Sequence, residues 1–221
     1  MSPRKSAAEA EKTRDRITKR AVELATIEGL EGVTIGRLAE DLGMSKAGLI
    51  GHFGSKEEMQ MATVEEAGAE FANEIWEPAA GLPEGLERLL AIVDLWIDNV
   101  SRRHPGGCFW TAASMEMDGR KGKVRDRIAD QLGNWHRTLG RDVKIAQRNG
   151  EIPDDVDPDQ VAFEIRSLIM GLTQEEQLFG SLDAPGRART AARRALGIPV
   201  DTESAVPKGR SRPRPKATAA G

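Results

Sequence analysis

The sequence has little of what secreted and membrane proteins need: one cysteine, Cys108, and no long apolar run. A single thiol cannot form an internal disulfide, so the composition does not indicate an oxidising compartment. Charged residues interrupt every apolar stretch before the roughly 18 residues that a membrane span requires. The first 20 residues are charged throughout, unlike a secretory signal. We therefore expect a cytoplasmic protein with no membrane segment.

The residues of metal and nucleophile chemistry are equally scarce, with three histidines and one cysteine. His104 and Cys108 lie four positions apart, but Pro105-Gly106-Gly107 separates them, so a shared helix face cannot be assumed. Neither a metal centre nor a nucleophile with orienting partners can be assembled from this set. Cys108 is better interpreted as a small buried hydrophobe. We expect no enzyme activity, no metal and no cofactor.

Charge is unevenly distributed along the chain, although the net charge is only -3. Both ends are basic and the middle is acidic. Residues 199–221 are rich in Pro, Arg, Ser, Lys and Ala and cannot bury enough surface to offset the entropy of ordering, so we expect a disordered tail. A solvated terminus and non-specific nucleic-acid contact are its two interpretations.

Apolar residues recur at helical spacing nearly everywhere, and no segment alternates with period two. Gly29 ends the first helix, and Ser55 with Glu58 fits a capping box that begins a long helix stopping near Pro78. Further helices are expected up to about Leu196. The sequence therefore predicts an all-α fold.

The stretch from Thr34 to Phe53 fits two short helices joined by a tight turn. Thr34 and Ser45 are suited to cap them, and Gly43 supplies the turn. In the second helix Leu49, His52 and Phe53 fall on one side. The opposite side carries Lys46, Ala47, Ile50 and Gly51. This arrangement is typical of a helix-turn-helix that lays its second helix in a major groove.

Residues 10–60 resemble the N-terminal domain of TetR/AcrR-family regulators, in order and without gaps. The resemblance is carried by Thr13-Arg14, Ile17, Ala21, Gly29, Val33-Thr34-Ile35, Leu38-Ala39, Leu42-Gly43-Met44-Ser45, Leu49 and His52-Phe53-Gly54-Ser55-Lys56-Glu57. It implies that residues 45–52 form the recognition helix and that Thr34 and Lys56 contact phosphates. The DNA-binding residues would be Thr34, Ser45, Lys46, Ala47, Ile50, Gly51, His52 and Lys56.

One departure from the family pattern affects the DNA contacts. Ile50 stands where the family commonly has tyrosine, and Gly51 where it often has a bulkier residue. Ile50 cannot hydrogen-bond a phosphate, although it could touch a thymine methyl group. Gly51 weakens its helix by up to about 1 kcal/mol relative to alanine.

The resemblance also implies a domain organisation and a mode of action. We expect a basic N-terminal arm (1–9), a helix-turn-helix domain (10–56), an effector-binding and dimerisation domain (57–198) and the tail (199–221). The protein would be a transcriptional regulator, a repressor that a small apolar effector releases from an inverted-repeat operator. Its partners would be double-stranded DNA, a small-molecule effector and a second copy of itself.

Large apolar side chains in the second domain indicate where an effector could bind. Each alone fits core packing, but together they suggest a cavity between helices. The candidate effector-binding residues are Phe71, Trp76, Trp96, Phe109, Trp110, Met115 and Trp135.

The helix expected over 158–180 carries an apolar stripe wider than one neighbouring helix can cover. We expect it to form the dimer interface, as the last two long helices do in the family. The candidate interface residues are Val161, Ile165, Leu168, Ile169 and Leu172.

Two other functions are possible from the sequence alone. An enzyme would require activity that depends on His104 or Cys108. A helical interaction protein with a decayed DNA-binding domain is suggested only by Ile50 and Gly51, and the retained Lys46, Lys56 and capped turn argue against it.

Overall fold

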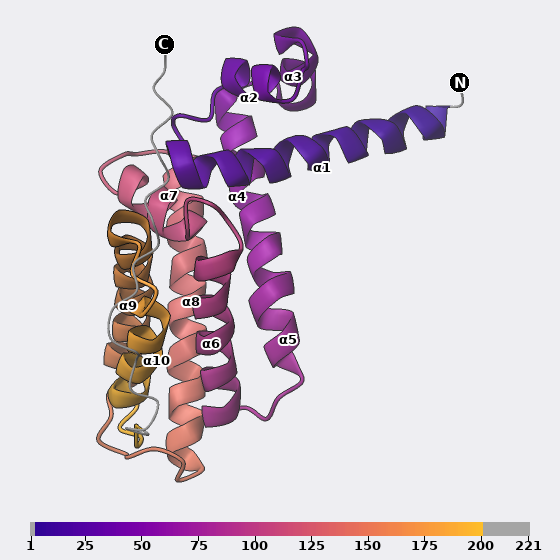
Figure 1. Cartoon of the computed structure of the whole chain (residues 1–221). Helices are drawn as coiled ribbons and strands as arrows, with labels where there is room; N and C mark the ends of the chain where they lie inside the picture. Colours follow the sequence, from indigo (N-terminus) through magenta and orange to yellow (C-terminus); the bar gives the residue numbers. More distant parts are fainter. Residues whose placement is uncertain (1–2, 201–221) are drawn as a thin grey trace. The chain divides into compact units, whose positions relative to one another are not determined.

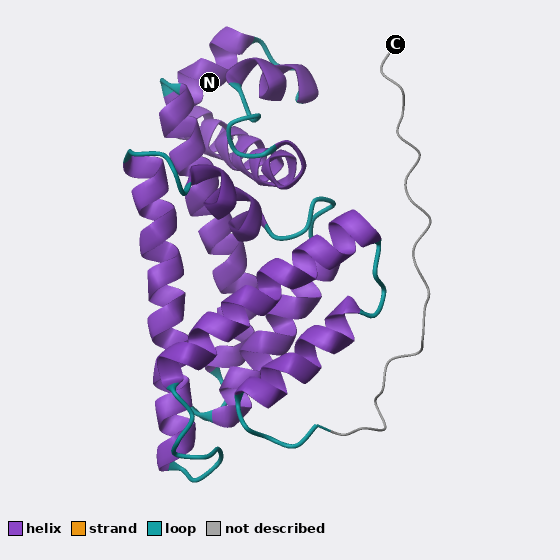
Figure 2. Cartoon of the chain, turned by 90° about the vertical axis from the view of Figure 1, so that its left-hand side faces the viewer, coloured by secondary structure: helices purple, strands orange, loops and turns teal. Residues whose placement is uncertain are grey.

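A computed structural model of the chain describes residues 3–200. This part of the chain is helical and contains no β-strand (Figures 1 and 2), which confirms the predicted all-α class. The elements are α1 (Pro3–Glu28), α2 (Ile35–Asp41), α3 (Lys46–Phe53), α4 (Lys56–Phe71), the π-helix η1 (Ala72–Trp76), α5 (Glu77–Ala80), α6 (Leu86–Arg102), α7 (Phe109–Met117), α8 (Lys123–Arg148), α9 (Pro158–Phe179) and α10 (Ala184–Ala195). Of the tail predicted to be disordered (199–221), residues 201–221 lie outside the described residues.

The helices divide into two compact units. Of the described residues, unit 1 contains 3–81 together with 104–138, and unit 2 contains 82–103 together with 139–200. Helix α8 therefore contributes its first part to unit 1 and its last part to unit 2. Among residues 3–200, none of the helices combines the length and the apolar composition that a membrane crossing requires.

Unit 1 is organised around α1, which packs on α4 and α7 (Figure 1). From Pro3 onward, the predicted arm (1–9) belongs to α1, which continues past α4 as one uninterrupted helix (Figure 1). Gly29 ends α1 as predicted, with a positive φ of 76°. The core of this part consists of Ile17, Ala21, Leu24, Leu30, Leu38, Leu49, Met59 and Val64, each at most 2% exposed.

Helix α4 begins as predicted, and the helical stretch that it opens ends close to the predicted position. The Ser55 hydroxyl accepts a hydrogen bond from the Glu58 amide at 3.1 Å, which confirms half of the capping box. The Glu58 carboxylate does not reach back. It contacts the Lys123 ammonium at the start of α8 instead. The helical stretch continues through the π-helix η1 into α5 and ends at Ala80, two residues after Pro78.

Unit 2 is built from α6, α9, α10 and the end of α8, with α9 packed on both α6 and α10. Two sets of charges join its helices. Arg88 of α6 donates to the fully buried Asp142 of α8, with its Nε 3.0 Å from the carboxylate. Arg189 of α10 bridges Asp94 and Asp98 of α6 at 2.9 and 2.8 Å. The carboxylates compensate the cost of burying these guanidinium groups.

Candidate DNA-binding surface and aromatic cluster

The two short helices α2 and α3 form a capped helix-turn-helix. The Thr34 hydroxyl accepts from the Arg37 amide at 3.1 Å and the Ser45 hydroxyl from the Gly48 amide at 3.0 Å, so both predicted caps are confirmed. Gly43 has a φ of 64°, and the Met44 amide donates to the Ala39 carbonyl at 2.8 Å. The positive φ of Gly43 and this backbone hydrogen bond to the small residue Ala39 together set the angle between α2 and α3.

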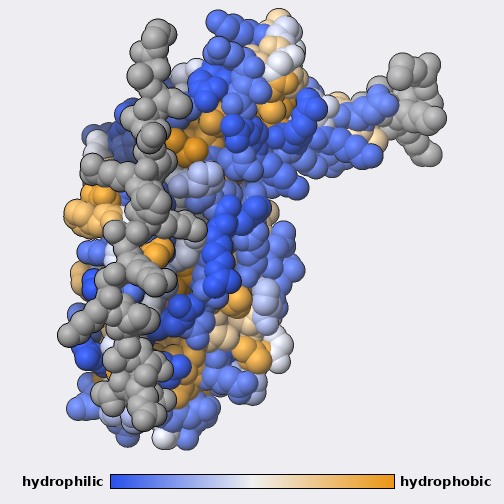
Figure 3. All heavy atoms as spheres, in the orientation of Figure 1, coloured by the Kyte–Doolittle hydropathy of each residue, from blue (hydrophilic) through white to orange (hydrophobic). Residues whose placement is uncertain are grey.

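One face of α3 is buried and the other is exposed. Leu49 and Phe53 pack inside unit 1, whereas Ser45, Lys46, Ala47, Ile50 and Gly51 are exposed. His52 is half-buried, between the two faces. The region of α2 and α3 accordingly shows hydrophobic as well as hydrophilic residues at its surface (Figure 3). Exposed small side chains would let the α3 backbone approach a partner closely, and Lys46 adds the cation of this face.

Basic residues of α1 hold α3 in place, a role that the sequence analysis missed. The Arg14 guanidinium donates to the His52 carbonyl and lies 4.4 Å from the centre of the Phe53 ring. Arg16 reaches the Met44 sulfur at 3.9 Å, at the turn between α2 and α3. Helical spacing places Arg14 beside buried Ile17 and Thr18, but only the fold shows that its side chain meets the end of α3.

Lys56, predicted to contact a phosphate, is engaged within the protein. Its ammonium lies 2.8 Å from the Glu31 carboxylate and 3.0 Å from the Glu31 carbonyl oxygen. Hydrogen bonds from Lys56 and then Gln60 lower the pKa of Glu31. A phosphate would have to compete with Glu31 for this lysine, so its DNA contact stays a prediction that the geometry does not favour.

The loop that leads from α1 to α2 is held by α4 and α7 at the same time. The Glu116 carboxylate of α7 accepts from the amides of Leu30 at 2.6 Å and Glu31 at 3.2 Å. On the other side, Gln60 of α4 donates to the Leu30 carbonyl at 3.1 Å. Gly29 makes room for this, since a Cβ there would lie 2.9 Å from Glu116. The loop that positions the helix-turn-helix is therefore set jointly by two other helices of unit 1.

Five of the predicted effector-binding residues form one aromatic cluster in unit 1. Phe71 stacks on Trp135 with ring centres 3.8 Å apart, and Trp110 meets Trp135 edge-on at 4.7 Å. Phe109 joins the cluster through Trp110, with ring centres 5.3 Å apart, and Trp76 joins it through Phe71, with ring centres 6.0 Å apart. The rings come from α4, η1, α7 and α8. π-turns in helices are frequent at functional sites, and η1 lies directly after Phe71 within this cluster.

Two of the predicted effector-binding residues do not belong to this cluster. Trp96 lies on α6, within the core of unit 2. Met115 is 59% exposed on α7. The structure therefore brings five of the seven candidates together, and effector binding by any of them stays a prediction. Residue type alone could not separate them, because a tryptophan on an apolar helix face is equally suited to either core.

The predicted dimer residues also need correction. Val161, Ile165, Ile169 and Leu172 are at most 3% exposed within a single chain, and Leu168 is half-buried. A surface already covered by α6 and α10 cannot serve a second subunit. The exposed stripe of α9 runs on the opposite face instead, at spacings of three and four residues, through Phe163, Ser167, Met170, Gly171, Gln174 and Leu178.

His104 pairs with a carboxylate, and Cys108 is buried. The His104 Nε2 atom lies 3.1 Å from the Glu70 carboxylate, and Cys108 is 4% exposed. In the part of the chain that the structure describes, no three side chains of His, Cys, Asp or Glu gather as metal ligands would.

Comparison with known proteins agrees with this architecture. The family "Bacterial regulatory proteins, tetR family" matches residues 17–62, and "Tetracyclin repressor-like, C-terminal domain" matches residues 85–192. The HTH-type transcriptional regulator SrpR of Pseudomonas putida is 25% identical over 173 residues, 78% of each chain.

Solved structures share the fold. A TetR transcriptional regulator from Chloroflexus aurantiacus superposes with a TM-score of 0.78 at 23% identity, over 86% of this chain and 96% of that one. AibR in complex with isovaleryl coenzyme A and operator DNA gives a TM-score of 0.70 at 22% identity, over 84% and 99%. With a tetR-family N-terminal match followed by a repressor-like C-terminal match, the chain belongs to the TetR family of DNA-binding transcriptional regulators, which are not enzymes.

Proposed function

We propose that this regulator is a repressor that binds an inverted-repeat operator as a homodimer and leaves it when a small, mostly apolar effector binds. The observation that carries the proposal is the capped helix-turn-helix with one exposed face on α3. In the proposed complex that face enters the major groove through Ser45, Lys46, Ala47, Ile50 and Gly51, with His52 and Thr34 at its edges. Ile50 at 44% exposure is placed to touch a thymine methyl group.

The proposed domain organisation assigns DNA binding to residues 10–56, preceded by the basic arm 1–9. Residues 57–198 would bind the effector and form the dimer, followed by the tail 199–221. AibR, which shares the fold, was solved with both a small ligand and operator DNA. That precedent supports the same two kinds of partner here.

Dimerisation through α9 is part of the proposal, on the face that the chain itself leaves open. Phe163 and Leu178 are each 59% exposed and Met170 is 39% exposed. A stripe of large apolar side chains on a monomer is an aggregation liability unless a partner covers it. A two-fold axis would pair the stripe with its own copy, and exposed Gly171 would permit close approach. The recognition helices would then be spaced by about 34–36 Å.

The rings of the aromatic cluster would favour an apolar effector, and the helices that carry them link the cluster to the loop before α2. Trp110 and Glu116 lie on the same short helix α7, so a shift of the ring would move the carboxylate that binds the Leu30 and Glu31 amides. Phe71 lies on α4, which begins with Lys56 and contains Gln60. An effector that inserts among the rings would thus act on both helices that hold the loop before α2. A few kcal/mol of differential binding would be enough to release DNA.

The test starts with protein purified from its own host. Small molecules extracted from it are identified by mass spectrometry and titrated against the protein alone and against its complex with DNA from upstream of its own gene. We expect tryptophan fluorescence and the DNA complex to change over the same concentrations. A ligand that changes fluorescence while the DNA complex persists would contradict the proposed release.

A further inference from the structure

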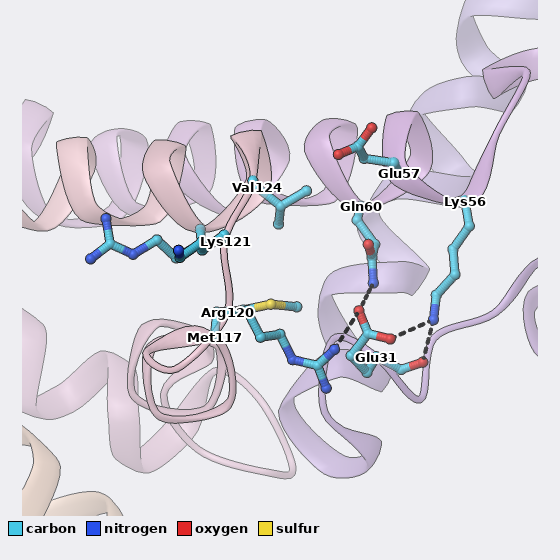
Figure 4. Close-up of a pocket in the computed structure, with 10 residues that line it drawn as sticks. Glu31, Lys56, Glu57, Gln60, Met117, Arg120, Lys121 and Val124 are labelled. Carbon is cyan, nitrogen blue, oxygen red and sulfur yellow. Dashed lines mark hydrogen bonds and ion pairs between the residues drawn. The ribbon is translucent and has the colours of Figure 1, made fainter.

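A hollow of about 500 Å³ opens in unit 1 beside Glu31, lined by residues other than the five rings of the aromatic cluster (Figure 4). Its walls come from three places in the chain: the loop before α2, the first turn of α4, and the segment from the end of α7 to the start of α8. Its apolar surface comes from Met117 and Val124, which are 3% and 7% exposed. The volume is in the range of small-molecule sites.

Cations outnumber carboxylates around the hollow. Lys56, Arg120, Lys121 and Arg125 line it, against Glu31 and Glu57. Glu31 already engages Lys56 at 2.8 Å and Arg120 at 3.6 Å. Among the described residues, Arg125 forms an ion pair with no residue but its exposed sequence neighbour Asp126, at 3.2 Å, and Lys121 forms none. The positive charge of the last two side chains is therefore available to a ligand.

The surrounding backbone adds to this positive potential. Lys123 at the start of α8 forms ion pairs with Glu57 and Glu58 in the first turn of α4. The N-terminal ends of two long helices are thereby held next to each other at the hollow. Helix N-termini carry partial positive charge and favour anions. The backbone supports the same sign of ligand as the four cationic side chains.

We propose that this hollow is a second ligand site, which binds a small organic anion through Lys121, Arg125 and Arg120. The ligand would carry one carboxylate or phosphate group, to face the cations, on a short apolar body, to contact Met117 and Val124. The site is separate from the aromatic cluster, so the proposal does not depend on the effector proposed there.

Glu31 acts as the internal competitor of such a ligand. Its carboxylate occupies Lys56 and Arg120, and its backbone belongs to the loop that positions α2. An anion that draws these cations away loosens the contacts that α4 and the segment after α7 make with Glu31 of that loop. Binding at the hollow and binding of DNA are therefore linked, and by thermodynamic reciprocity each changes the affinity of the other.

The test is isothermal titration calorimetry of the full chain at fixed ionic strength, with hexanoate and hexyl phosphate as anionic probes and hexanol as the neutral control. We expect at least one anion to bind and hexanol not to bind. Binding of one anion but not the other assigns the head group. The double variant Lys121→Gln/Arg125→Gln should bind the anion at least about fivefold more weakly, because it lacks two of the cations that face the ligand. The variant should fold normally, since both side chains are exposed and the core is untouched.

Glu31→Gln provides the sharper signature, because it removes the competing charge. This variant should bind the anion about two- to fivefold more tightly than the unmodified chain. Glu28→Gln, which removes a carboxylate outside the hollow, and Lys144→Gln, which removes an exposed cation elsewhere on α8, should leave binding unchanged. The proposal is overturned if neither anion binds, if hexanol binds equally well, if the double variant binds like the unmodified chain, or if Glu31→Gln fails to tighten binding.

Discussion

Helices α3 and α9 each bury one face inside their own unit and leave the other exposed, but the two exposed faces differ in chemistry. The exposed face of α3 consists of small residues with one lysine and one isoleucine. That of α9 presents Phe163, Met170 and Leu178 with short polar residues between them. The first leaves room for a charged, hydrated partner to approach the backbone. The second favours association, because a matching apolar surface on a partner would remove its large side chains from water.

This difference shows how the two binding functions can be separated by mutation. Contacts of α3 with DNA would be polar, dependent on salt and individually modest. Contacts across α9 would be apolar and mutually dependent, so a single charge can disrupt all of them.

The largest effect is expected from Phe163→Glu. A carboxylate buried by each copy in a dry apolar interface opposes pairing by several kcal/mol in order of magnitude, mainly through desolvation. Sedimentation velocity should show a monomer or aggregates, and specific operator binding should be lost although α3 is intact. Lys144→Glu, which places the same carboxylate at an exposed position of α8 in unit 2 and also removes a positive charge, should remain a dimer. A dimeric Phe163→Glu protein would place the interface on another surface.

Lys46→Ala tests the other side of the comparison. If Lys46 reads a base, the substitution should cost about 1–3 kcal/mol of operator affinity while the dimer stays intact. Fluorescence anisotropy with an operator fragment measures the loss, with Lys144→Ala as the control. Unchanged affinity in the Lys46 variant would mean that α3 is docked differently.

The sequence was sufficient for local structure and insufficient for tertiary placement. Thr34, Ser45 and Ser55 could be recognised as caps because a cap depends on an amide three residues away. The register of α9 could not be recognised, since this helix carries large apolar residues on both faces and periodicity does not show which face the chain covers. The partners of Lys56 and Glu58 are 25 and 65 residues away, so only the fold identifies them.

A smaller effect is expected when the cap of α3 is removed. Ser45→Ala should lower the free energy of unfolding by about 1 kcal/mol, because the Gly48 amide loses its acceptor. Urea unfolding followed by circular dichroism measures this. Ser101→Ala, within α6, should change stability little, since alanine is the better helix former at an interior position. Equal losses in the two variants would show that the cap contributes nothing special.

The smallest effect concerns the charges that hold α2 against α1. Hydrogen bonding to Arg20, at 2.6 Å, lowers the pKa of Asp41 below its ordinary value of 3.8. A carboxylate whose pKa is lowered by folding stabilises the fold fully at pH values above its ordinary pKa. This contribution is lost as pH falls through the folded-state pKa. Asp41→Asn should therefore cost up to about 1 kcal/mol near neutral pH, and this cost should shrink as pH falls through the lowered pKa of Asp41. A cost that does not depend on pH would exclude the ion pair as its cause.

The most direct test of the account is in vitro selection of binding sites from random DNA by the full chain. A dimer with α3 in successive major grooves predicts convergence on an inverted repeat whose half-sites are centred about 10–10.5 base pairs apart, or a multiple of that spacing. The Phe163→Glu protein, selected in parallel, should enrich no such repeat. Convergence on a single asymmetric site, or the same inverted repeat from the Phe163→Glu protein, would contradict the central claim that α9 pairs two copies so that their α3 helices read symmetric half-sites.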